Sequence, residues 1–551
     1  MRTGIRCNTA QRTLAKLSLE NVTTRKVNSF RPASFKKLVR HLQTAAGVHE
    51  IKVIDAHERK YCIIAHCREI SPLIKPFHSS SELQVLRSLL EEITEIRLKP
   101  GGRVSAAERP AYLTFDPTHY DAIWLRDSLW AYLALKTRFC RPAQKTSRLA
   151  NDAAQILLGL LDYLSSPEQR ARFQNTIERP ETLKGRSSPM DVVHIRFDAN
   201  SSDFEDVLVN GQPQIWNHKQ NDALGLFFDL ILQAFETSEI TPADLSAGHW
   251  ETLACLPAYF SQIRFFEMED SGTWEEIERV NTSSVALVTS SLETFLKFLT
   301  EDRNRDSIRI LSEAARRLGI DNFLRPASIR ELINQGYGRI FSQLERGGES
   351  PLYARASSRY RTSDAALLNL LYPARLQQLT REHKDAILTL IQPLIGRVGI
   401  RRYHRDSYQS GNFWFNPPVF DEAALELQTE DTRSAAEFAQ REKQFIWNSE
   451  AQWFFDSWYS KCCGIMFREY CEPHYRERQL EFFNRALGQI TGGTKRNPQL
   501  GADGNPVPPF SLPESYNTII KANSQYFAPS PIVPLNWAKA SLWLALEELS
   551  K

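Results

Sequence analysis

The chain has 551 residues, of which 42% are hydrophobic and 24% are charged, and its 68 Lys and Arg nearly balance its 65 Asp and Glu. A near-neutral balance argues against a nucleic-acid-binding protein, which needs a basic excess or a basic stripe. No run approaches the roughly 20 apolar residues that cross a bilayer. The chain is rich in aromatic residues, with 11 Trp, 17 Tyr and 30 Phe. Such residues fill helical cores and also line sugar-binding clefts, and composition does not choose between the two.

The N-terminal part predicts a small extension. Residues 1–48 form a basic leader that ends in a short helical pattern at 35–44. Residues 50–67 contain two β-like runs, IKVI and YCIIA, on either side of a charged turn, and predict a hairpin. The leader lacks the apolar stretch of a signal peptide. We therefore expect a soluble intracellular protein whose leader is a solvated tail rather than a transit peptide, while export by an uncleaved C-terminal signal stays open.

After Pro76 the pattern is helical almost throughout. SSELQVLRSLLEEITEIRLK places apolar residues at helical spacing behind a serine-rich start. Further helices are predicted at 125–139, 147–165, 221–237, 282–300, 305–318, 364–372, 381–395, 433–470, 474–489 and 536–549. Long polar loops are predicted at 165–220, 265–281, 397–420 and 491–530. No repeat period is visible, which favours a toroid of inner and outer helices, with functional loops at one end, over stacked repeats.

The cysteines do not indicate a metal site. The chain has eight, scattered without a C-x-x-C pair or a histidine spacing typical of zinc. Such residues are typical of ordinary thiols in a reducing compartment. The sequence therefore predicts neither a metal nor a cofactor.

Two loops carry carboxylates suited to acid–base chemistry. Glu275 and Glu276 follow Trp274, shortly before a helix cap at 281–284. Burial against a Trp face favours the neutral form of a carboxyl, as a general acid requires. Glu514 lies in the proline-rich loop PPFSLPESYN. Taken singly, each is read more simply as a solvated loop carboxylate.

Three further segments combine aromatic and polar residues. Arg126 and Asp127 open a helix beside Trp124, where an adjacent charge pair can clamp sugar hydroxyls. The simpler reading is an aspartate that stabilises the helix dipole. QIWNHKQNDALGLFF (214–228) and IRRYHRDSYQSGNFWFN (400–416) have the same character. Each signal is weak alone, so the order of the segments is the informative feature.

In this order the segments resemble the signature regions of glycoside hydrolase family 15, the glucoamylases. They also resemble the glucoamylase-like region of phosphorylase kinase α and β subunits. The matching elements span about residues 112–549 and are Trp124-Leu125-Arg126-Asp127-Ser128, Trp216 to Asp222, Gly272-Thr273-Trp274-Glu275-Glu276 with Asn281-Thr282-Ser283-Ser284, Arg402-Tyr403-His404-Arg405-Asp406-Ser407-Tyr408, Leu512-Pro513-Glu514-Ser515-Tyr516 and Pro534-Leu535-Asn536-Trp537. The resemblance implies an all-α (α/α)6 barrel over residues 76–551, after an extension over residues 1–75 that contains the β-hairpin.

The resemblance also implies an activity. It is the exo-acting, inverting hydrolysis of α-1,4-glucosidic bonds of starch- or glycogen-like glucans, which releases β-glucose from non-reducing ends. Glu275 would be the general acid and Glu514 the general base, which inverting chemistry places roughly 6.5–9.5 Å apart. The residues implied in substrate binding are Trp124, Arg126, Asp127, Trp216, Trp274, Glu276, Arg402, Asp406, Trp414 and Trp537. The implied partner is an α-glucan or a maltooligosaccharide, with no nucleic acid and no membrane, and the oligomeric state is left open.

Some features depart from the glucoamylase pattern. The insert from Ser166 to Val209 and the loop 491–511 are not typical of the family, and Arg405 stands where glucoamylases tend to have an acid. The segment 449–467 is closer to the phosphorylase kinase branch. The alternative function is therefore a catalytically silent, glucan-sensing module of that type. The presence of both carboxylates favours the enzyme, with trehalose- or dextran-type linkages left open, and the near-neutral charge disfavours a nucleic-acid binder.

Overall fold

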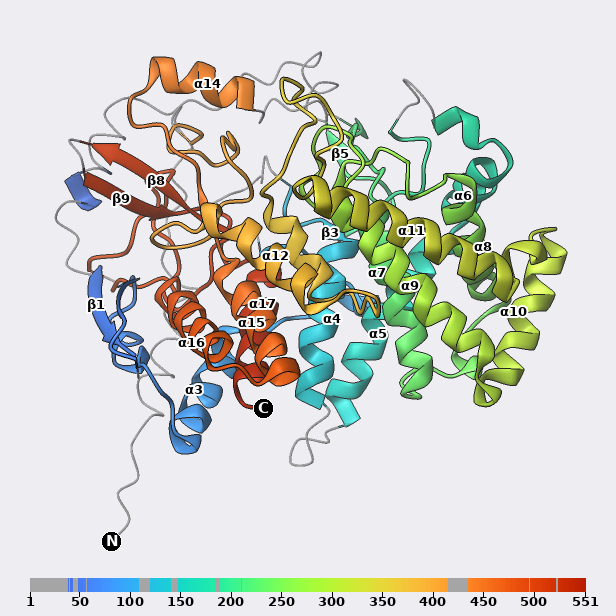
Figure 1. The fold of residues 1–551 in the computed structure, drawn as a ribbon, viewed down its shortest axis with the longest axis horizontal. Coiled ribbons are helices and arrows are strands. Elements are labelled where there is room, and N and C mark those ends of the chain that lie inside the picture. The colour runs from blue at the N-terminus through green and yellow to red at the C-terminus, as the bar shows by residue number, and fades with distance from the viewer. Residues whose placement is uncertain are drawn as a thin grey trace, which may run out of the picture.

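The computed structural model describes residues 38, 40–42, 48–55, 57–108, 119–139, 147–183, 189–209, 211–414, 435–494, 496–521 and 524–551. Within these residues, inner helical elements close into a ring in which each packs on the next and the last packs on the first. In chain order they are α4 (Leu125–Phe139), α7 (Asn221–Glu236), α9 (Thr282–Thr300), the 3-10 helix η9 (Ala365–Leu370), α15 (Asp456–Tyr470) and α17 (Asn536–Leu549). Figure 1 shows the helices as one body, with α8 and α10 at one side and β1 at the other.

Outer helices alternate with the inner elements along the chain and pack against them. They are α3 (Ser80–Ile93), α5 (Ser147–Leu164), α8 (Ala247–Gln262), α11 (Pro326–Arg346), α12 (Arg381–Ile391) and α16 (Pro473–Gly488). Among the described residues, the α-helices α6 (Pro167–Glu178), α10 (Arg305–Arg317) and α14 (Ala435–Gln444) lie outside this alternation. The alternation of inner and outer helices is that of the predicted (α/α)6 barrel.

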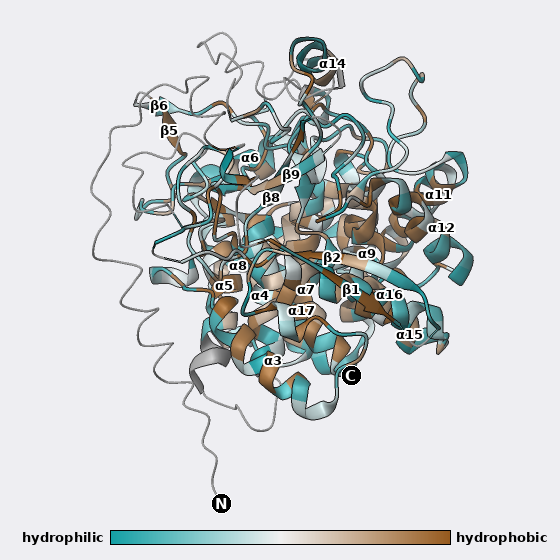
Figure 2. Cartoon of the chain, turned by 90° about the vertical axis from the view of Figure 1, so that its left-hand side faces the viewer, coloured by the Kyte–Doolittle hydropathy of each residue, from teal (hydrophilic) through white to brown (hydrophobic). Residues whose placement is uncertain are grey.

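Sequence explains which helices are inner. In α17 every residue is buried, and in α7 every residue from the first to Ala234 is buried. Helices that are apolar on nearly all sides must be surrounded by other elements. In α10, by contrast, the buried residues are Ser307, Leu311, Ala314 and Ala315, which lie along one stripe. Figure 2 shows the hydrophobic colour concentrated on the helices, while the loops at the end that carries α14 are largely hydrophilic.

Glycine allows the closest approach between two inner helices. A Cβ atom on Gly225 of α7 would lie 2.7 Å from the backbone nitrogen of Val288 in α9. Such a contact is too short for any side chain, so only glycine permits this spacing. The two backbones therefore pack directly against each other.

The predicted elements agree with the structure in most places, and α4 and α9 begin and end at the predicted residues. The prediction of one helix over 433–470 is wrong. Helix α14 ends at Gln444, and α15 begins only at Asp456. Between them β7 (Gln452–Trp453) pairs with β8 (Ser515–Lys521), so the chain is extended there. The loops predicted at 165–220 and 491–530 also contain α6 and the antiparallel pair of β8 with β9 (Ser524–Pro529).

The predicted N-terminal hairpin is confirmed. Strands β1 (His49–Ile54) and β2 (Lys60–Ala65) pair antiparallel, and β2 packs on α16. The leader up to residue 37 and most of the helical pattern at 35–44 lie outside the described residues. The division into residues 1–75 and 76–551 stays a prediction. Among the described helices, none combines the length and the apolar character needed to span a membrane.

The topology places the predicted site residues at one end of the barrel. Each outer helix brings the chain back to the end at which the preceding inner element began. The N-terminal ends of the inner elements therefore lie together. Strand β3 (Ile123–Trp124) leads into α4, the 3-10 helix η6 (Gly272–Trp274) precedes α9, and Glu514 precedes α17. Segments that are far apart in the sequence therefore meet at this end.

Candidate active site

Glu275 lies in a tight turn ahead of α9. Its backbone is left-handed, with φ 59° and ψ 42°, which is uncommon for a residue with a side chain and is concentrated at functional sites. Arg126 donates from Nη2 to its Oε1 at 2.6 Å, and Trp124 donates from Nε1 to its Oε2 at 3.2 Å. These donors hold both oxygens of the carboxylate.

Glu514 is more deeply buried, with 4% of its surface exposed. The Tyr120 hydroxyl donates to its Oε1 at 2.5 Å, and Gln409 donates from Nε2 to its Oε2. Burial raises the pKa of Glu514 to about 8, and Asp127 adds to this rise, whereas the hydrogen bonds and Arg402 oppose it. Its donors, unlike Arg126 beside Glu275, carry no charge.

An aromatic pair connects the two carboxyls. The rings of Tyr120 and Trp124 lie 5.6 Å apart, Tyr120 donates to Glu514, and Trp124 donates to Glu275. Burial raises the pKa of Asp127 to about 7, and Glu275 raises it further, although Arg126 opposes the rise. Since Asp127 in turn raises the pKa of Glu514, it lies within electrostatic range of both glutamates. The structure therefore brings the two predicted catalytic carboxyls to one site.

Glu276 belongs to a different network from its neighbour Glu275. Arg402 donates from Nη2 to Glu276 at 2.8 Å, and the Tyr403 hydroxyl donates to the same carboxylate. Burial opposes ionisation, but Arg402 and Arg361 hold the pKa of Glu276 below its ordinary value. Asp406 accepts two hydrogen bonds from Arg402, at 2.6 and 2.7 Å. A bidentate pair of this kind fixes the plane of the guanidinium.

Trp274 and Trp537 lie below these polar groups. Their rings stack at 6.4 Å, and they are 9% and 7% exposed. Trp274 donates from Nε1 to Asp364 at 2.7 Å, and the Arg126 guanidinium carbon lies 5.8 Å from the Trp537 ring. The guanidinium carbon of Arg402 lies 5.5 Å from the Trp274 ring. The two tryptophan rings therefore pack against Arg126 and Arg402.

Trp216 and Trp414 are half-buried, and only one of them contacts the group around Glu275. The Trp216 ring lies 6.2 Å from that of Trp124, edge to face. Trp414 packs on Phe413 at 5.1 Å, and its Nε1 donates to Asn517 at 3.1 Å when the Asn517 amide has the orientation that satisfies its neighbours. Trp414 therefore contacts β8 through Asn517.

Sequence reasoning missed several groups that contact the predicted residues. Tyr120 and Gln409 lie inside or next to the aromatic and polar segments described above. No local sequence pattern indicates that they bind Glu514. Arg361 lies in a segment without any such signal. Arg196 places its guanidinium carbon 4.4 Å from the Trp124 ring and 4.3 Å from the Trp216 ring. It comes from the insert that departs from the glucoamylase pattern, on β4 (Arg196–Phe197), which pairs with β3.

His194, Asp206 and His218 form the group among the described residues whose ligand types suit a metal, with one ligand atom from each within 4.8 Å of the others. His194 Nδ1 lies 2.7 Å from Asp206, and its Nε2 lies 2.9 Å from the Met190 carbonyl oxygen. Both ring nitrogens of His194 therefore already have an oxygen partner within the protein. Burial lowers the pKa of His218, which stacks on His194 at 3.8 Å and stays neutral. The absence of a metal stays a prediction.

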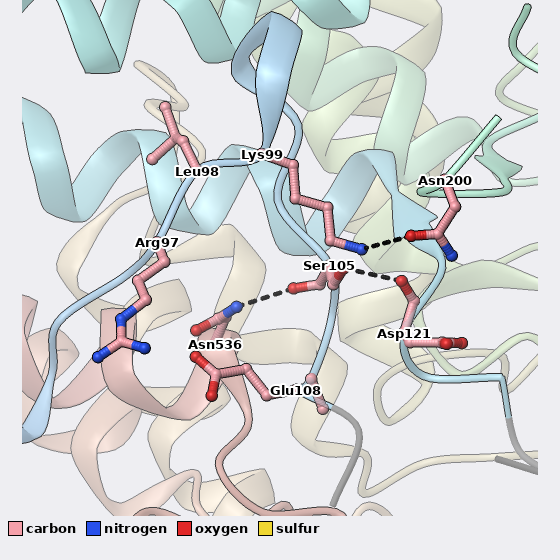
Figure 3. Close-up of a pocket in the computed structure, with 9 residues that line it drawn as sticks. Arg97, Leu98, Lys99, Ser105, Glu108, Asp121, Asn200 and Asn536 are labelled. Carbon is pink, nitrogen blue, oxygen red and sulfur yellow. Dashed lines mark hydrogen bonds between the residues drawn. The ribbon is translucent and has the colours of Figure 1, made fainter. Parts of the chain in front are cut away.

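A pocket of about 430 Å³ lies beside the predicted site residues and contains none of them. Figure 3 shows its lining, in which Lys99 donates to Asn200 at 3.4 Å and Asn536 donates to the Ser105 carbonyl at 2.8 Å. Asp121, which follows Tyr120 in the chain, also lines it. Most residues of its lining are polar or charged, and none of them is aromatic.

Comparison with solved structures shows the fold. A glycosidase structure aligns over 86% of this chain and 99% of its own, with a TM-score of 0.51 and 14% sequence identity. The glucoamylase of Saccharomycopsis fibuligera aligns over 85% of this chain and 95% of its own, with a TM-score of 0.49 and 13% identity. The alignment with the glycosidase and the ring of inner and outer helices show that the chain has a glycoside-hydrolase-like helical barrel, as the resemblance implied.

Comparison with curated proteins shows the family, although no protein-family model matches the chain. The putative protein YgeP of Escherichia coli (strain K12) is 36% identical over 102 residues, which are 18% of this chain and 100% of that protein. The uncharacterized lipoprotein YgeQ of the same strain is 41% identical over 217 residues, which are 38% of this chain and 78% of that protein. The chain belongs to the family of the uncharacterized lipoprotein YgeQ.

Proposed function

We propose that the protein is an exo-acting, inverting α-glucosidase that hydrolyses α-1,4-glucosidic bonds of glycogen- or starch-like glucans and releases β-glucose. The observation that carries this proposal is the placement of Glu275 and Glu514 at the two ends of the Tyr120–Trp124 pair. Two carboxyls in different surroundings are what acid–base hydrolysis of a glycoside needs. The glycosidase fold and the order of the motifs support the same activity.

In this proposal Glu514 is the general base. It accepts a proton from a water molecule, whose oxygen attacks the anomeric carbon while the bond to the leaving oxygen breaks. Glu275 donates a proton to that leaving oxygen from the opposite side of the sugar. One proton is taken up and one is given, so both carboxyls must exchange protons with solvent before the next turnover.

Glu275 needs its proton before it can act as the acid. Arg126 now donates to Glu275, and a terminal glucose whose hydroxyls bind Arg126 and Asp127 would compete for that guanidinium. Loss of the cationic partner favours the protonated carboxyl. Substrate binding therefore prepares Glu275 for proton donation.

Hydroxyl recognition is proposed for the charged residues around the carboxyls. Arg126, Asp127, Glu276, Arg402 and Asp406 offer fixed donors and acceptors, and charged groups make strong hydrogen bonds to hydroxyls. Trp124 and Trp216 offer aromatic faces beside them, over a floor formed by Trp274 and Trp537. The role predicted for Trp414 stays a prediction too. An uncharged glucan fits a chain with a net charge of only +3.

The test is incubation with maltooligosaccharides and with glycogen, following glucose release and its anomer by NMR. We expect β-glucose, and a loss of at least about 1,000-fold in kcat in both Glu275→Gln and Glu514→Gln. Glu267→Gln, an exposed change ahead of the Glu275 turn, is the control and should keep wild-type activity. Full activity in either test variant rejects the role given to that glutamate, and α-glucose as the first product rejects inversion.

A glucan-sensing module without turnover is the second candidate. The Arg126–Glu275 ion pair favours it, because a glutamate that keeps its cationic partner cannot protonate a leaving group. Calorimetry separates the two functions, since a sensor binds maltooligosaccharide with no glucose released over many hours.

The intracellular location also stays a proposal. YgeQ is described as a lipoprotein, so cell fractionation is the direct check of where this protein is located.

A further inference from the structure

Gln409 reaches Glu514 from a separate loop, 105 positions earlier in the chain. Its side chain is fully buried, and its Nε2 donates to the Glu514 oxygen that Tyr120 leaves free. Each carboxylate oxygen therefore has one neutral donor from the protein. Neither donor belongs to the segment that carries Glu514.

Ser515 decides which end of the Gln409 amide faces the carboxylate. Its hydroxyl donates to Oε1 of Gln409. With the amide oxygen engaged in this way, the NH₂ group must point toward Glu514. The residue next to the proposed base therefore orients the group that binds the base.

The backbone of Gln409 is held by the same strand. Asn517 lies two residues beyond Ser515 on β8, and side chains two apart point to the same face of a strand. In the amide orientation that satisfies its neighbours, Asn517 donates to the carbonyl oxygens of Gln409 at 2.7 Å and Ser410 at 2.8 Å. Gln409 has a left-handed backbone with φ 54°, so these contacts hold an uncommon conformation in place.

We propose that Gln409, oriented by Ser515, is a positioning residue that stabilises the ionised form of Glu514 against its burial and holds the carboxylate in one rotamer for proton abstraction from water. This inference rests on the proposed function, in which Glu514 is the general base. A donor to the charged form of a carboxyl stabilises that form, and burial acts against it. A neutral amide supplies this stabilisation without the counter-charge that would make the carboxylate a weaker base.

Variants of the two residues separate the parts of this arrangement. Gln409→Leu removes the donor and keeps an apolar side chain of similar length, whereas Ser515→Ala removes only the group that orients the amide. Tyr120→Phe is the comparison variant, because it removes the donor to the other oxygen of Glu514 and should move the Glu514 titration in the same direction. Circular dichroism shows whether each variant folds. If Gln409→Leu does not fold, the inference is tested with Ser515→Ala alone. This variant loses only one hydroxyl, so we expect it to fold.

The first measurement is a titration that does not depend on activity. The side-chain carboxyls of glutamate are labelled with ¹³C, and the Glu514 resonance is identified by its absence in Glu514→Gln. We expect Gln409→Leu to move the Glu514 titration to higher pH by about one unit, with a smaller shift in the same direction for Ser515→Ala. An unchanged titration in both variants overturns the inference.

The second measurement is the pH dependence of kcat/KM on maltooligosaccharides. The acid limb should move upward by the same amount as the titration, while KM at high pH stays within about twofold of wild type. An active wild type with no shift in either measurement rejects the role of Gln409 alone. A wild type that releases no glucose rejects the proposed function, and with it the role of Gln409 in proton abstraction.

Discussion

The two proposed catalytic glutamates differ only in their surroundings. Glu275 has a cationic partner in Arg126, whereas Glu514 has two neutral donors and lies almost completely buried. Burial raises the pKa of Glu514 to about 8, far from the ordinary range of a glutamate. As the proposed base, Glu514 therefore has to lose a proton that burial helps it to hold, so its role requires a pH near or above this pKa or a change of its surroundings when substrate binds.

The free energy of unfolding should depend on pH, because ionisation of the buried Glu514 destabilises the folded protein. Its pKa is higher in the folded protein than the ordinary value near 4.5, so the folded state binds the proton more tightly, and stability falls as pH rises from about 4.5 to about 8. Glu514→Gln cannot ionise, and we expect it to increase the free energy of unfolding by about 1–3 kcal/mol at a pH of about 9, with little effect near pH 4. Denaturant unfolding at both pH values measures this. An equal effect at both values contradicts the assignment.

Arg196 offers a second test at the residue scale. Its guanidinium lies over Trp124 and Trp216, where a desolvated cation–π contact contributes about 1–2 kcal/mol per pair. Arg196→Met keeps the aliphatic stem and removes the charge, so both rings become freer to move. We expect KM for maltooligosaccharides to rise about 5–30-fold, with kcat within about threefold of wild type.

Arg103→Met is the matched control for this prediction. Arg103 lies over Phe204 at 4.8 Å and Phe197 at 5.9 Å, away from the two tryptophans. Its removal should leave KM unchanged. A similar rise of KM in both variants would show that the insert acts through general stability and not through Trp124 and Trp216.

At the scale of elements, the sequence predicted those helix bounds that depend on nearby residues, namely on the local apolar pattern and on helix capping. Helix α4 has Asp127 in its first turn and α9 begins directly after Asn281, and both were predicted with the correct bounds. The break at β7 was missed because it depends on Trp453 pairing with Ser515, which is 62 positions away. The bond from Gln409 to Glu514 was missed for the same reason, since only the closed ring brings the two loops together.

Gly225 gives a test of the packing between α7 and α9. Gly225→Ala would place a methyl group 2.7 Å from the Val288 nitrogen, and two buried backbones cannot separate without disturbing their neighbours. We expect a loss of about 1–3 kcal/mol in the free energy of unfolding. Gly338→Ala on α11 is the control, because its new methyl group meets nothing within 4 Å and should stabilise the helix by about 0.5–1 kcal/mol. Equal effects of the two changes would contradict the close packing of the inner helices.

At the scale of the whole molecule, the proposed catalysis needs both halves of the ring. Glu275 precedes the third inner element and Glu514 precedes the sixth, and they are 239 positions apart. The stretch matched by YgeQ has 217 residues, so it includes at most one of the two carboxyls. Membership of this family therefore does not by itself carry the proposed chemistry. The proposed activity requires residues from both halves of the barrel.

The net charge of the sequence leads to a last prediction. With 68 basic and 65 acidic residues, the protein has little net field to attract or repel a substrate, and a glucan carries no charge for such a field to act on. We therefore expect kcat/KM on glycogen to change less than about twofold between about 20 mM and about 200 mM NaCl, although screening becomes much stronger over this range. The matched measurement uses a maltooligosaccharide that carries a phosphate group. A steep salt dependence on neutral glycogen would show that charged groups, and not hydroxyl contacts and aromatic faces, control substrate capture.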